Sequence, residues 1–287
     1  MQLTSTRIST ALGAEITDLD LRQDITRELA DALHNELLEH HVLFLPDADL
    51  SPAQMAALGA ELGTLGIRHH SYTSHPESDD VTVLEWGGDT VPDAAEWHAD
   101  MTYRATPPFA SILKAVVLPP VGGDTLWASM FSVHDALPPG LRRDLETLDA
   151  CHDMGSFRSD AWQRGGNDGI DRAMVEAGSA VHPIISHHPV TGRPYLNVSE
   201  SFTRFVIGLS APESARLLTQ LFDLTNRPEH HVRLRWQPNT IAIWDNRGTQ
   251  HYAVADYLPH RRVMHRVAVV ADARTPSFDA SAHPMPA

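Results

Sequence analysis

The N-terminal part of the chain alternates between strand-like and helix-like spacing of its hydrophobic residues. Residues 13–17 leave a glycine turn and are typical of a short strand. Over residues 24–40 an apolar side chain recurs at every fourth position, which predicts an amphipathic helix. The compact apolar run 41–45 predicts a buried strand. A serine followed by a proline then opens the stretch 51–62, an order typical of the N-cap and first position of a helix.

From residue 81 onward, short apolar or alternating runs separated by turn residues predict a chain built mostly of strands. The expected strands are 81–86, 110–118, 124–127, two within 181–198 around a turn at 189–192, 232–236, 240–244 and 262–270. Helices are expected at 131–150, with an interruption near 138–140, and at 213–224. Many short strands with a few helices favour a β-sandwich or jelly roll over a doubly wound parallel sheet.

The sequence shows neither an internal repeat nor a linker, so we expect a single domain over residues 1–287. Within it, residues 155–180 are polar and rich in glycine, which favours a lid-like insertion. Residues 274–287 combine prolines with small side chains and are expected to form a flexible tail. The polar and aromatic stretch 68–75 is too irregular for a regular element, and it is either a surface loop or a substrate-facing segment.

Composition narrows the range of functions. The formal net charge of −15 argues against binding to nucleic acid or to an anionic membrane surface. No run approaches the roughly 18 apolar residues of a membrane span, and the first residues lack the apolar stretch of a secretory signal. The single cysteine, Cys151, excludes an internal disulfide framework and a cysteine-based zinc site. We therefore expect a cytoplasmic protein with no nucleic-acid or membrane partner.

The short motif Trp97-His98-Ala99-Asp100 contains the first candidate chemistry. On an extended segment, side chains two positions apart point to one face, so His98 and Asp100 can converge on one ion. A second histidine from elsewhere in the chain would complete the two-histidine, one-carboxylate facial triad that suits non-haem Fe(II). The motif alone is weak evidence, because a chain with 18 histidines produces chance matches.

Three further motifs follow along the chain: Gly122-Gly-Asp-Thr125, Trp244-Asp-Asn-Arg247-x-Thr-Gln-His251 and Arg262-x-x-x-Arg266. In this order, together with the motif at 97–100, they resemble the taurine dioxygenase subfamily of the Fe(II)/2-oxoglutarate-dependent oxygenases. The resemblance extends from about Gly13 to Asp272, which is nearly the whole chain. It implies a mainly β fold with flanking helices around a double-stranded β-helix, or jelly roll.

The resemblance also implies roles for individual residues. The catalytic metal ligands for Fe(II) would be His98, Asp100 and His251. Thr125 and Arg262 would bind the cosubstrate 2-oxoglutarate, which is consumed together with O₂; the guanidinium fork of an arginine suits a carboxylate. The small anionic organic substrate would contact His69, Tyr72, Met101, Phe157, Phe202 and Arg266. A homo-oligomer, either a dimer or a tetramer, is expected.

The spacing of Arg262 and Arg266 favours two separate anions. On a strand both side chains face the same side with stems roughly 13 Å apart, so one would bind the cosubstrate and the other the prime substrate. The substrate side departs from the family pattern. Ala94 stands where the family has an asparagine, and the alignment needs a gap near His69, which makes His70 an alternative to it.

We expect hydroxylation of the carbon next to the anionic group, with a sulfonate such as taurine as the first candidate substrate. The hydroxylated product would collapse to an aldehyde and sulfite, while 2-oxoglutarate gives succinate and CO₂. The same chemistry on an alkyl sulfate, or on an aryloxy or other carboxylate, is the alternative, because an arginine fork fits each of these anions. An alternative of a different class is a non-catalytic jelly-roll binding module, although the presence of all the presumed ligands counts against it.

Other candidate residues have structural interpretations. The pair His152-Asp153 is similar to the metal pair of helical zinc or manganese phosphohydrolases, but the chain has too many predicted strands for that fold. Trp236 and Trp244 are interpreted as core residues. His265 is expected to point away from the two arginines of its own strand.

Overall fold

The structure is a computed structural model that describes residues 1–17, 19, 21, 25–66, 72–90, 92, 95–155 and 178–275. The strands are β1 (Thr4–Arg7), β2 (Ala14–Thr17), β3 (Val42–Leu45), β4 (Gly63–Leu65), β5 (Thr73–His75), β6 (Ser78–Trp86), β7 (Ala110–Val117), β8 (Thr125–Ser129), β9 (Asp149–Asp153), β10 (Ser179–Pro183), β11 (Ile185–His187), β12 (Pro194–Leu196), β13 (Thr203–Val206), β14 (His231–Leu234), β15 (Ile241–Asp245), β16 (Thr249–Ala253) and β17 (Arg262–Asp272). The helices are α1 (Arg27–His40), α2 (Pro52–Leu62), α3 (Met130–Asp135), α4 (Pro139–Leu145), α6 (Ala211–Thr225) and the short 3₁₀ helix η1 (Pro228–His230).

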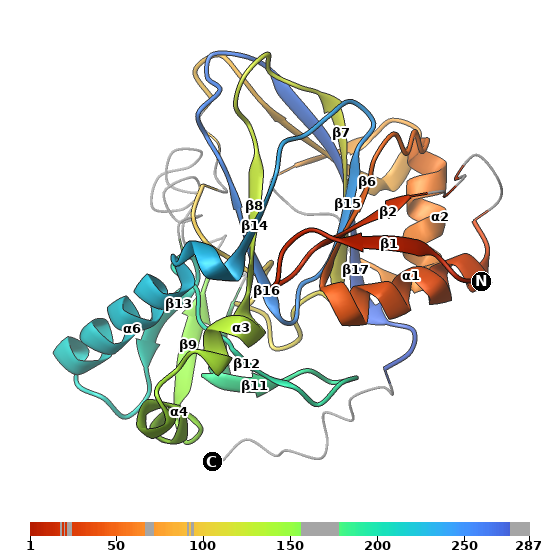
Figure 1. The fold of residues 1–287 in the computed structure, drawn as a ribbon. Helices are drawn as coiled ribbons and strands as arrows, with labels where there is room; N and C mark the ends of the chain where they lie inside the picture. The colour runs from red at the N-terminus through yellow and green to blue at the C-terminus, as the bar shows by residue number, and fades with distance from the viewer. Residues whose placement is uncertain are drawn as a thin grey trace.

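Strand β17 lies inside a large sheet and pairs with β7 on one side and β6 on the other (Figure 1). This nine-stranded sheet has the order β1-β2-β3-β15-β7-β17-β6-β5, with β4 also paired to β17. A three-stranded sheet, β14-β8-β16, is antiparallel throughout. Strand β17 is rich in valine, and β-branched side chains pack well on a half-buried pleated surface.

The two sheets face each other across a common core. Trp127 of β8 and Val232 of β14 pack with Phe44 of β3, Trp244 of β15 and Met264 of β17, and all five are buried. Two facing antiparallel sheets of short strands form a jelly roll. The prediction of a mainly β fold with flanking helices around a jelly-roll core is confirmed.

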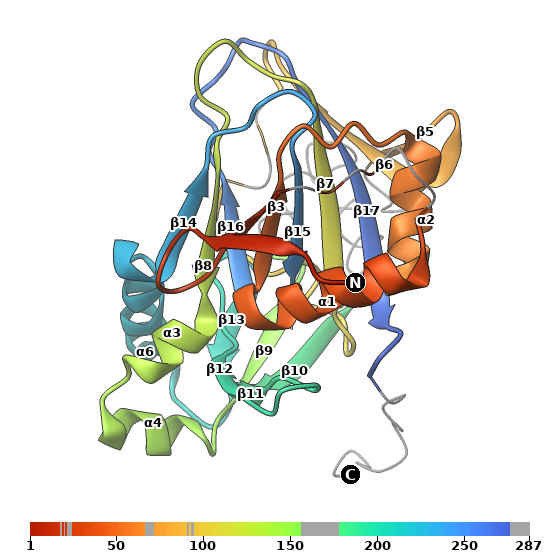
Figure 2. The same cartoon turned by 45° about the vertical axis from the view of Figure 1, so that its right-hand side comes forward.

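Helices α1 and α2 cover the other face of the large sheet (Figure 2). Leu33 and Leu37 of α1 and Leu58 of α2 belong to one buried cluster with Ile112 of β7 and Val267 of β17. The apolar stripe predicted from the sequence is therefore the surface that fixes α1 on the sheet. This support leaves the inner face of β17 free to line a pocket between the two sheets.

The helices begin at the residues whose types predict an N-terminus. The Thr26 hydroxyl accepts a hydrogen bond from the first turn of α1. Ser51 and Gln54 form a capping box at α2, and Ser210 and Glu213 form another at α6. The helices predicted for these three segments are confirmed.

The helix predicted over residues 131–150 is wrong in its last part. Two short helices, α3 and α4, are separated at Leu137 and Pro138, because a proline lacks the N–H that a helix interior needs. Residues 149–153 then form β9, the middle strand of the sheet β10-β9-β13. Ala150 and His152 of β9 are buried, so this segment follows the two-residue period of a strand.

Two predicted segments lie mostly outside the described residues. The lid-like insertion at 155–180 overlaps residues 156–177, and the flexible tail at 274–287 overlaps residues 276–287, so both stay predictions. Within the described ranges, none of the helices combines the length and the apolar character that crossing a bilayer requires.

Candidate functional site

Three side chains from distant parts of the sequence meet at one end of the pocket between the sheets. The Nε2 atoms of His98 and His251 lie 3.9 Å and 3.7 Å from Oδ1 of Asp100. One potential ligand atom from each of the three residues lies within 4.8 Å of the other two, and all three residues are buried. The convergence of His98 and Asp100 expected from their spacing is thus present, and the described residues contain no other such cluster.

Backbone pairing brings the two histidines together. His98 N donates to His251 O at 3.1 Å, and His251 N donates to His98 O at 2.8 Å. The motif at 97–100 therefore pairs with β16 at the edge of the small sheet through one antiparallel bridge, between His98 and His251. The two imidazole rings lie 4.1 Å apart between centroids. Two segments that are far apart in the sequence thus present their histidines to the same point.

Hydrogen bonding and burial make the three side chains suitable ligands for a metal cation. His98 Nδ1 lies 2.8 Å from the carbonyl oxygen of Glu96, which only accepts, so the ring donates there and its Nε2 is free to bind a metal. Burial and the neighbouring His98 hold the pKa of His251 well below its usual value, which keeps that imidazole neutral. Burial would raise the pKa of Asp100, but Arg266 and the two histidines outweigh it and lower that pKa to about 2.

The second carboxylate oxygen of Asp100 is held by polar neighbours. Arg266 Nη2 donates to Asp100 Oδ2 at 2.6 Å and to the Ser111 hydroxyl at 3.1 Å. The Ser111 hydroxyl itself donates to the same Oδ2 at 3.0 Å. These contacts leave Oδ1 facing the histidines. Two imidazoles and one oriented carboxylate are a donor set that fits a divalent transition metal with open coordination positions.

Arg262 lies at the opposite end of the pocket, on the same face of β17 as Arg266. Its guanidinium lies 5.9 Å from the ring centroids of both Trp86 and Tyr257, and its residue is only 2% exposed. Nη2 donates weakly to the Thr125 hydroxyl at 3.4 Å, and burial lowers the pKa of the guanidinium. Among the described residues, no carboxylate forms an ion pair with Arg262, and its buried Nε has no hydrogen-bond partner. A buried cation of this kind fits an incoming carboxylate.

Trp236, interpreted from the sequence as a core residue, also has a role at this end. It is buried, and its indole N–H donates to the Thr125 hydroxyl at 2.9 Å. The Gly122-Gly-Asp-Thr125 turn brings Thr125 into place. A side chain at Gly123 would meet Arg262 Cδ at 3.3 Å, and the φ of +74° there also favours glycine. No pattern in the sequence indicates the contact between Trp236 and Thr125.

The residues predicted to contact the prime substrate fall into two groups. Tyr72, Met101 and Phe202 line the pocket, and Met101 adopts a positive φ of 51° directly after the carboxylate ligand candidate. His69 and Phe157 lie outside the described residues, as do the alternative His70 and the departure at Ala94. The pocket is also lined by residues that sequence reasoning did not assign to it: Leu84, Trp86, Tyr103, Leu113, Trp244 and Ala253.

The pair His152-Asp153 has no metal-site geometry. His152 is fully buried, with Nδ1 3.0 Å from the Thr102 hydroxyl and Nε2 3.3 Å from the Thr203 hydroxyl. Asp153 forms an ion pair with Arg204 at 3.0 Å. His152 therefore supports the loop that follows Asp100, whereas Asp153 pairs with Arg204, in agreement with the sequence argument against a phosphohydrolase site. The His265 ring meets that of His75 edge to face, with centroids 4.8 Å apart, and does not line the pocket, as its strand position predicts.

Comparison with known proteins places this site in a family. The model of the "Taurine catabolism dioxygenase TauD, TfdA family" matches residues 4–268. The chain belongs to this family. TauD/TfdA proteins are 2-oxoglutarate-dependent dioxygenases, so the chain is an oxidoreductase that uses 2-oxoglutarate and O₂. The alternative of a non-catalytic binding module is therefore wrong.

Individual relatives extend over most of the chain. An alkylsulfatase from Acinetobacter baylyi is 31% identical over 96% of this chain and 87% of its own length. An alpha-ketoglutarate-dependent sulfate ester dioxygenase from Pseudomonas putida is 32% identical over 91% of this chain and 87% of its own length. The crystal structure of a putative alpha-ketoglutarate-dependent taurine dioxygenase from Burkholderia xenovorans superposes with a TM-score of 0.81 at 30% identity, covering 94% of this chain and 93% of that one. The similarity thus includes both sheets and the site between them.

Proposed function

We propose that this dioxygenase holds Fe(II) with His98, Asp100 and His251 and hydroxylates the carbon next to the anionic group of a small organic sulfonate or sulfate ester. The donor set supports the metal, since two imidazoles and one carboxylate are typical of non-haem Fe(II) oxygenases. When bound, the iron supplies the redox chemistry that couples decarboxylation of 2-oxoglutarate by O₂ to hydroxylation of a C–H bond. We also propose that residues 1–287 form a single domain, which is supported by the contribution of β8, β16, β17 and the segment at 97–100 to one pocket.

The buried guanidinium of Arg262, which forms no ion pair with a described carboxylate, is the observation that supports the cosubstrate site. Its guanidinium is buried, and none of the described carboxylates pairs with it. The far carboxylate of 2-oxoglutarate would supply the missing negative charge, with the Thr125 hydroxyl as a second contact. The two oxygens at the other end of 2-oxoglutarate would then reach the open metal positions. We propose this orientation for the cosubstrate.

Arg266 is the second cation of the pocket and the proposed partner of the substrate anion. Its Nη2 contacts Asp100 and Ser111, while its buried Nε has no hydrogen-bond partner within the described residues. Donors therefore remain for an oxygen of a sulfonate or sulfate. Arg266 would hold that group beside the metal and present the neighbouring carbon for hydroxylation.

The pocket walls favour a substrate with an apolar tail. Leu84, Leu113, Phe202 and Ala253 contribute apolar surface, and Asp100 is the only carboxylate among the described lining residues. Asp100 is already engaged, so the ammonium of taurine would find no described anionic partner, and an unpartnered ammonium is costly to bury. Alkyl sulfates and amine-free sulfonates therefore compete with taurine as substrates, in agreement with the names of two relatives. The hydroxylated product would release an aldehyde with sulfate or sulfite.

A substrate panel tests this proposal. Purified protein with Fe(II), ascorbate, 2-oxoglutarate and O₂ is given taurine, amine-free alkanesulfonates, alkyl sulfates and aryloxyalkanoates, and succinate, sulfite and sulfate are measured. We expect succinate formation that depends on a sulfonate or sulfate, with stoichiometric sulfite or sulfate. A response to aryloxyalkanoates alone would replace the sulfur anion with a carboxylate. Activity supported by Zn²⁺ would contradict the redox mechanism, because Zn²⁺ has no redox chemistry.

A direct competition refines the substrate class. Taurine and propanesulfonate have similar length, and only taurine carries an amine. We expect the amine-free sulfonate to be consumed faster when both are present, because Asp100, the only carboxylate among the described lining residues, is already paired with Arg266. A clear preference for taurine would show that another group recognises the ammonium.

A further inference from the structure

Asn246 lies directly after β15, behind the metal ligand candidate Asp100, and is 3% exposed. Its side-chain oxygen accepts a hydrogen bond from Asp100 N at 2.7 Å. Its side-chain nitrogen donates to Asp100 O at 3.1 Å. One amide thus binds both polar groups of the Asp100 backbone, although Asn246 is 146 residues away in the sequence.

The same amide also fixes the far end of the loop that Asp100 begins. Asn246 Nδ2 donates to Pro108 O at 3.1 Å, and Asn246 N donates to Phe109 O at 2.8 Å. The side chain therefore ties together the two ends of residues 100–108, just before β7. Only an amide offers an acceptor and two donors at these positions, since a carboxylate has no donor and alanine has neither.

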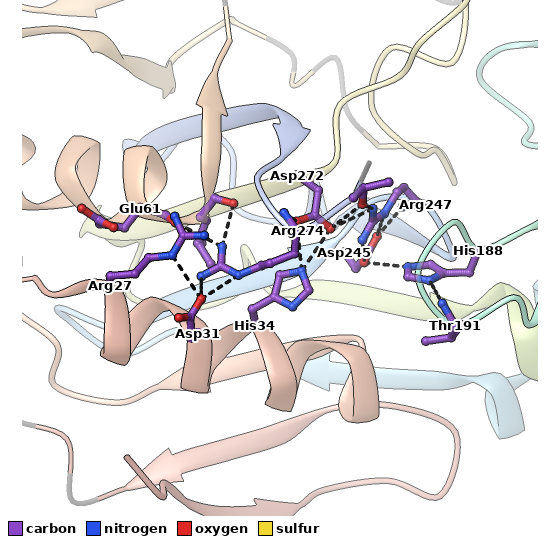
Figure 3. Close-up of polar contacts among 12 residues, drawn as sticks. Arg27, Asp31, His34, Glu61, His188, Thr191, Asp245, Arg247, Asp272 and Arg274 are labelled. Atoms are coloured by element: carbon purple, nitrogen blue, oxygen red, sulfur yellow. Dashed lines mark hydrogen bonds and ion pairs between the residues drawn. The ribbon is translucent and has the colours of Figure 1, made fainter. Parts of the chain in front are cut away.

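The two residues that flank Asn246 in the sequence, Asp245 and Arg247, belong to a series of polar contacts in the interior. We call this series the ion-pair ladder: His34, Asp272, Arg247, Asp245 and His188 (Figure 3). Arg247 donates to Asp245 at 2.7 Å and to Asp272 at 3.0 Å. His34 of α1 lies 3.0 Å from Asp272, and His188 lies 3.0 Å from Asp245. The ladder thus joins α1, the end of β17 and the 188–193 turn around Asn246.

We propose that Asn246 is a positioning residue that sets the backbone of Asp100, and through it the direction of the carboxylate, with the ion-pair ladder as its anchor. This inference rests on the proposed metal centre. The Asp100 side chain is short and has only two torsion angles. It therefore cannot compensate for a shift of its backbone, and such a shift would move Oδ1 away from the histidines. Residues that orient metal ligands typically change metal affinity by about 10–100-fold when they are replaced.

Two variants separate the parts of the contact. Asn246→Ala removes all three side-chain bonds, whereas Asn246→Asp preserves the shape and the acceptor for Asp100 N but loses both donors. Asn197→Ala is the matched control, because its Nδ2 donates to the Ser186 hydroxyl at 3.1 Å and Asn197 does not line the pocket. All are compared by anaerobic titration with Mn²⁺ in a calorimeter and by thermal unfolding of the metal-free protein.

We expect Mn²⁺ to bind about 10–100-fold more weakly to both Asn246 variants, with Asn197→Ala equal to wild type. Amide hydrogen exchange of the peptide containing Asp100 gives a readout without metal. Exchange should accelerate in Asn246→Ala and remain slow in Asn246→Asp, where the acceptor survives. If the alanine variant does not fold, the aspartate variant decides.

Unchanged Mn²⁺ affinity in a folded Asn246 variant would overturn the inference, because a purely structural role lowers only the unfolding temperature. A separate result bears on the proposed metal centre itself. If Asp100→Asn binds Mn²⁺ as tightly as wild type, the centre lies elsewhere and the proposed function fails, whatever Asn246 does.

Discussion

Strand β17 places two arginines, Arg262 and Arg266, on the side that faces the pocket. They differ in whether a carboxylate of the protein pairs with them. Arg262 is 2% exposed and forms an ion pair with none of the described carboxylates. Its polar neighbours are the hydroxyls of Thr125 and Tyr257, and the Asp124 carboxylate, which is paired with Arg233, acts on its pKa from a longer range. Arg266 lies four residues further along the strand and already donates a hydrogen bond to the Asp100 carboxylate at 2.6 Å. The charge of Arg262 therefore lacks a paired carboxylate until an anionic ligand binds, whereas the charge of Arg266 is already balanced by Asp100.

This difference separates the tasks of the two arginines. A buried guanidinium without a counter-charge is costly, and an incoming carboxylate removes that cost, so Arg262 should act on the cosubstrate alone. Arg266 shares its charge with Asp100 and should therefore act on both the metal ligand and the prime substrate. Substitutions at the two ends should give different patterns of kinetic constants, although both remove one positive charge.

The largest loss of turnover is expected from a substitution of Asp100, which removes the carboxylate that pairs with Arg266. Asp100→Asn should reduce turnover to background and weaken Mn²⁺ binding more than any other change, because it removes the single anionic ligand. It also leaves the half-buried Arg266 without a counter-charge, so the metal-free protein should unfold at a lower temperature. Succinate release, calorimetry and thermal unfolding are the measurements. Wild-type turnover in this variant would exclude the proposed triad.

A related contrast concerns how much of the fold the sequence predicts. The helices at α1, α2 and α6 and the long strands were predictable, because their hydrophobic period and caps are local signals. Strand β9 was not, since Asp149-Ala-Cys-His-Asp153 has polar residues at buried positions, such as His152. His152 can be buried because both ring nitrogens form hydrogen bonds with threonine hydroxyls. Thr102 and Thr203 are distant in the sequence, so no local pattern predicts these bonds.

The site shows the same limit. The four motifs predict the three ligand candidates and Arg262, because residue types and their order along the chain are enough to identify them. The contacts that orient them join residues far apart in sequence: 166 positions for Arg266 with Asp100, 146 for Asn246 with Asp100 and 111 for Trp236 with Thr125. Their geometry depends on how the two sheets close, so the sequence alone does not specify them.

The next largest effect is expected at the other end of β17. Arg262→Ala should raise the KM for 2-oxoglutarate by roughly 10–100-fold, corresponding to about 1.5–3 kcal/mol for a charged hydrogen-bonded contact. The KM for the prime substrate should stay close to wild type at saturating cosubstrate. Steady-state kinetics with each substrate varied in turn measure both constants. Arg262→Lys is the control, since it restores the charge without the fork and should recover part of the affinity.

Substitution of Arg266 should produce a smaller and mixed pattern. Arg266→Gln should raise the KM of the prime substrate by roughly tenfold, while the KM for 2-oxoglutarate stays near wild type. Mn²⁺ affinity should also fall, because Asp100 Oδ2 loses its charged donor, although the Ser111 hydroxyl continues to hold that oxygen. If Arg262→Ala and Arg266→Gln shared one kinetic pattern, the separation of the two ends would be wrong.

The smallest effect is expected from Trp236, which acts on the cosubstrate end through Thr125. Its indole N–H donates to the Thr125 hydroxyl oxygen at 2.9 Å, which leaves the hydroxyl hydrogen free to point toward a bound carboxylate. Trp236→Phe removes this donor but keeps an aromatic ring in the core. The KM for 2-oxoglutarate should rise by roughly two- to tenfold, corresponding to about 0.5–1.5 kcal/mol for one neutral hydrogen bond.

Trp127 provides the matched control for this change. It is fully buried, its ring lies 6.3 Å from that of Trp236, and its indole N–H has no hydrogen-bond partner within the described residues. Trp127→Phe therefore removes the same volume of side chain from the same core without removing a bond to Thr125. Both variants should lose thermal stability through the cavity they create, but only Trp236→Phe should raise the KM for 2-oxoglutarate. Equal KM values in the two variants would assign the effect to core packing and remove Trp236 from the cosubstrate end of the pocket.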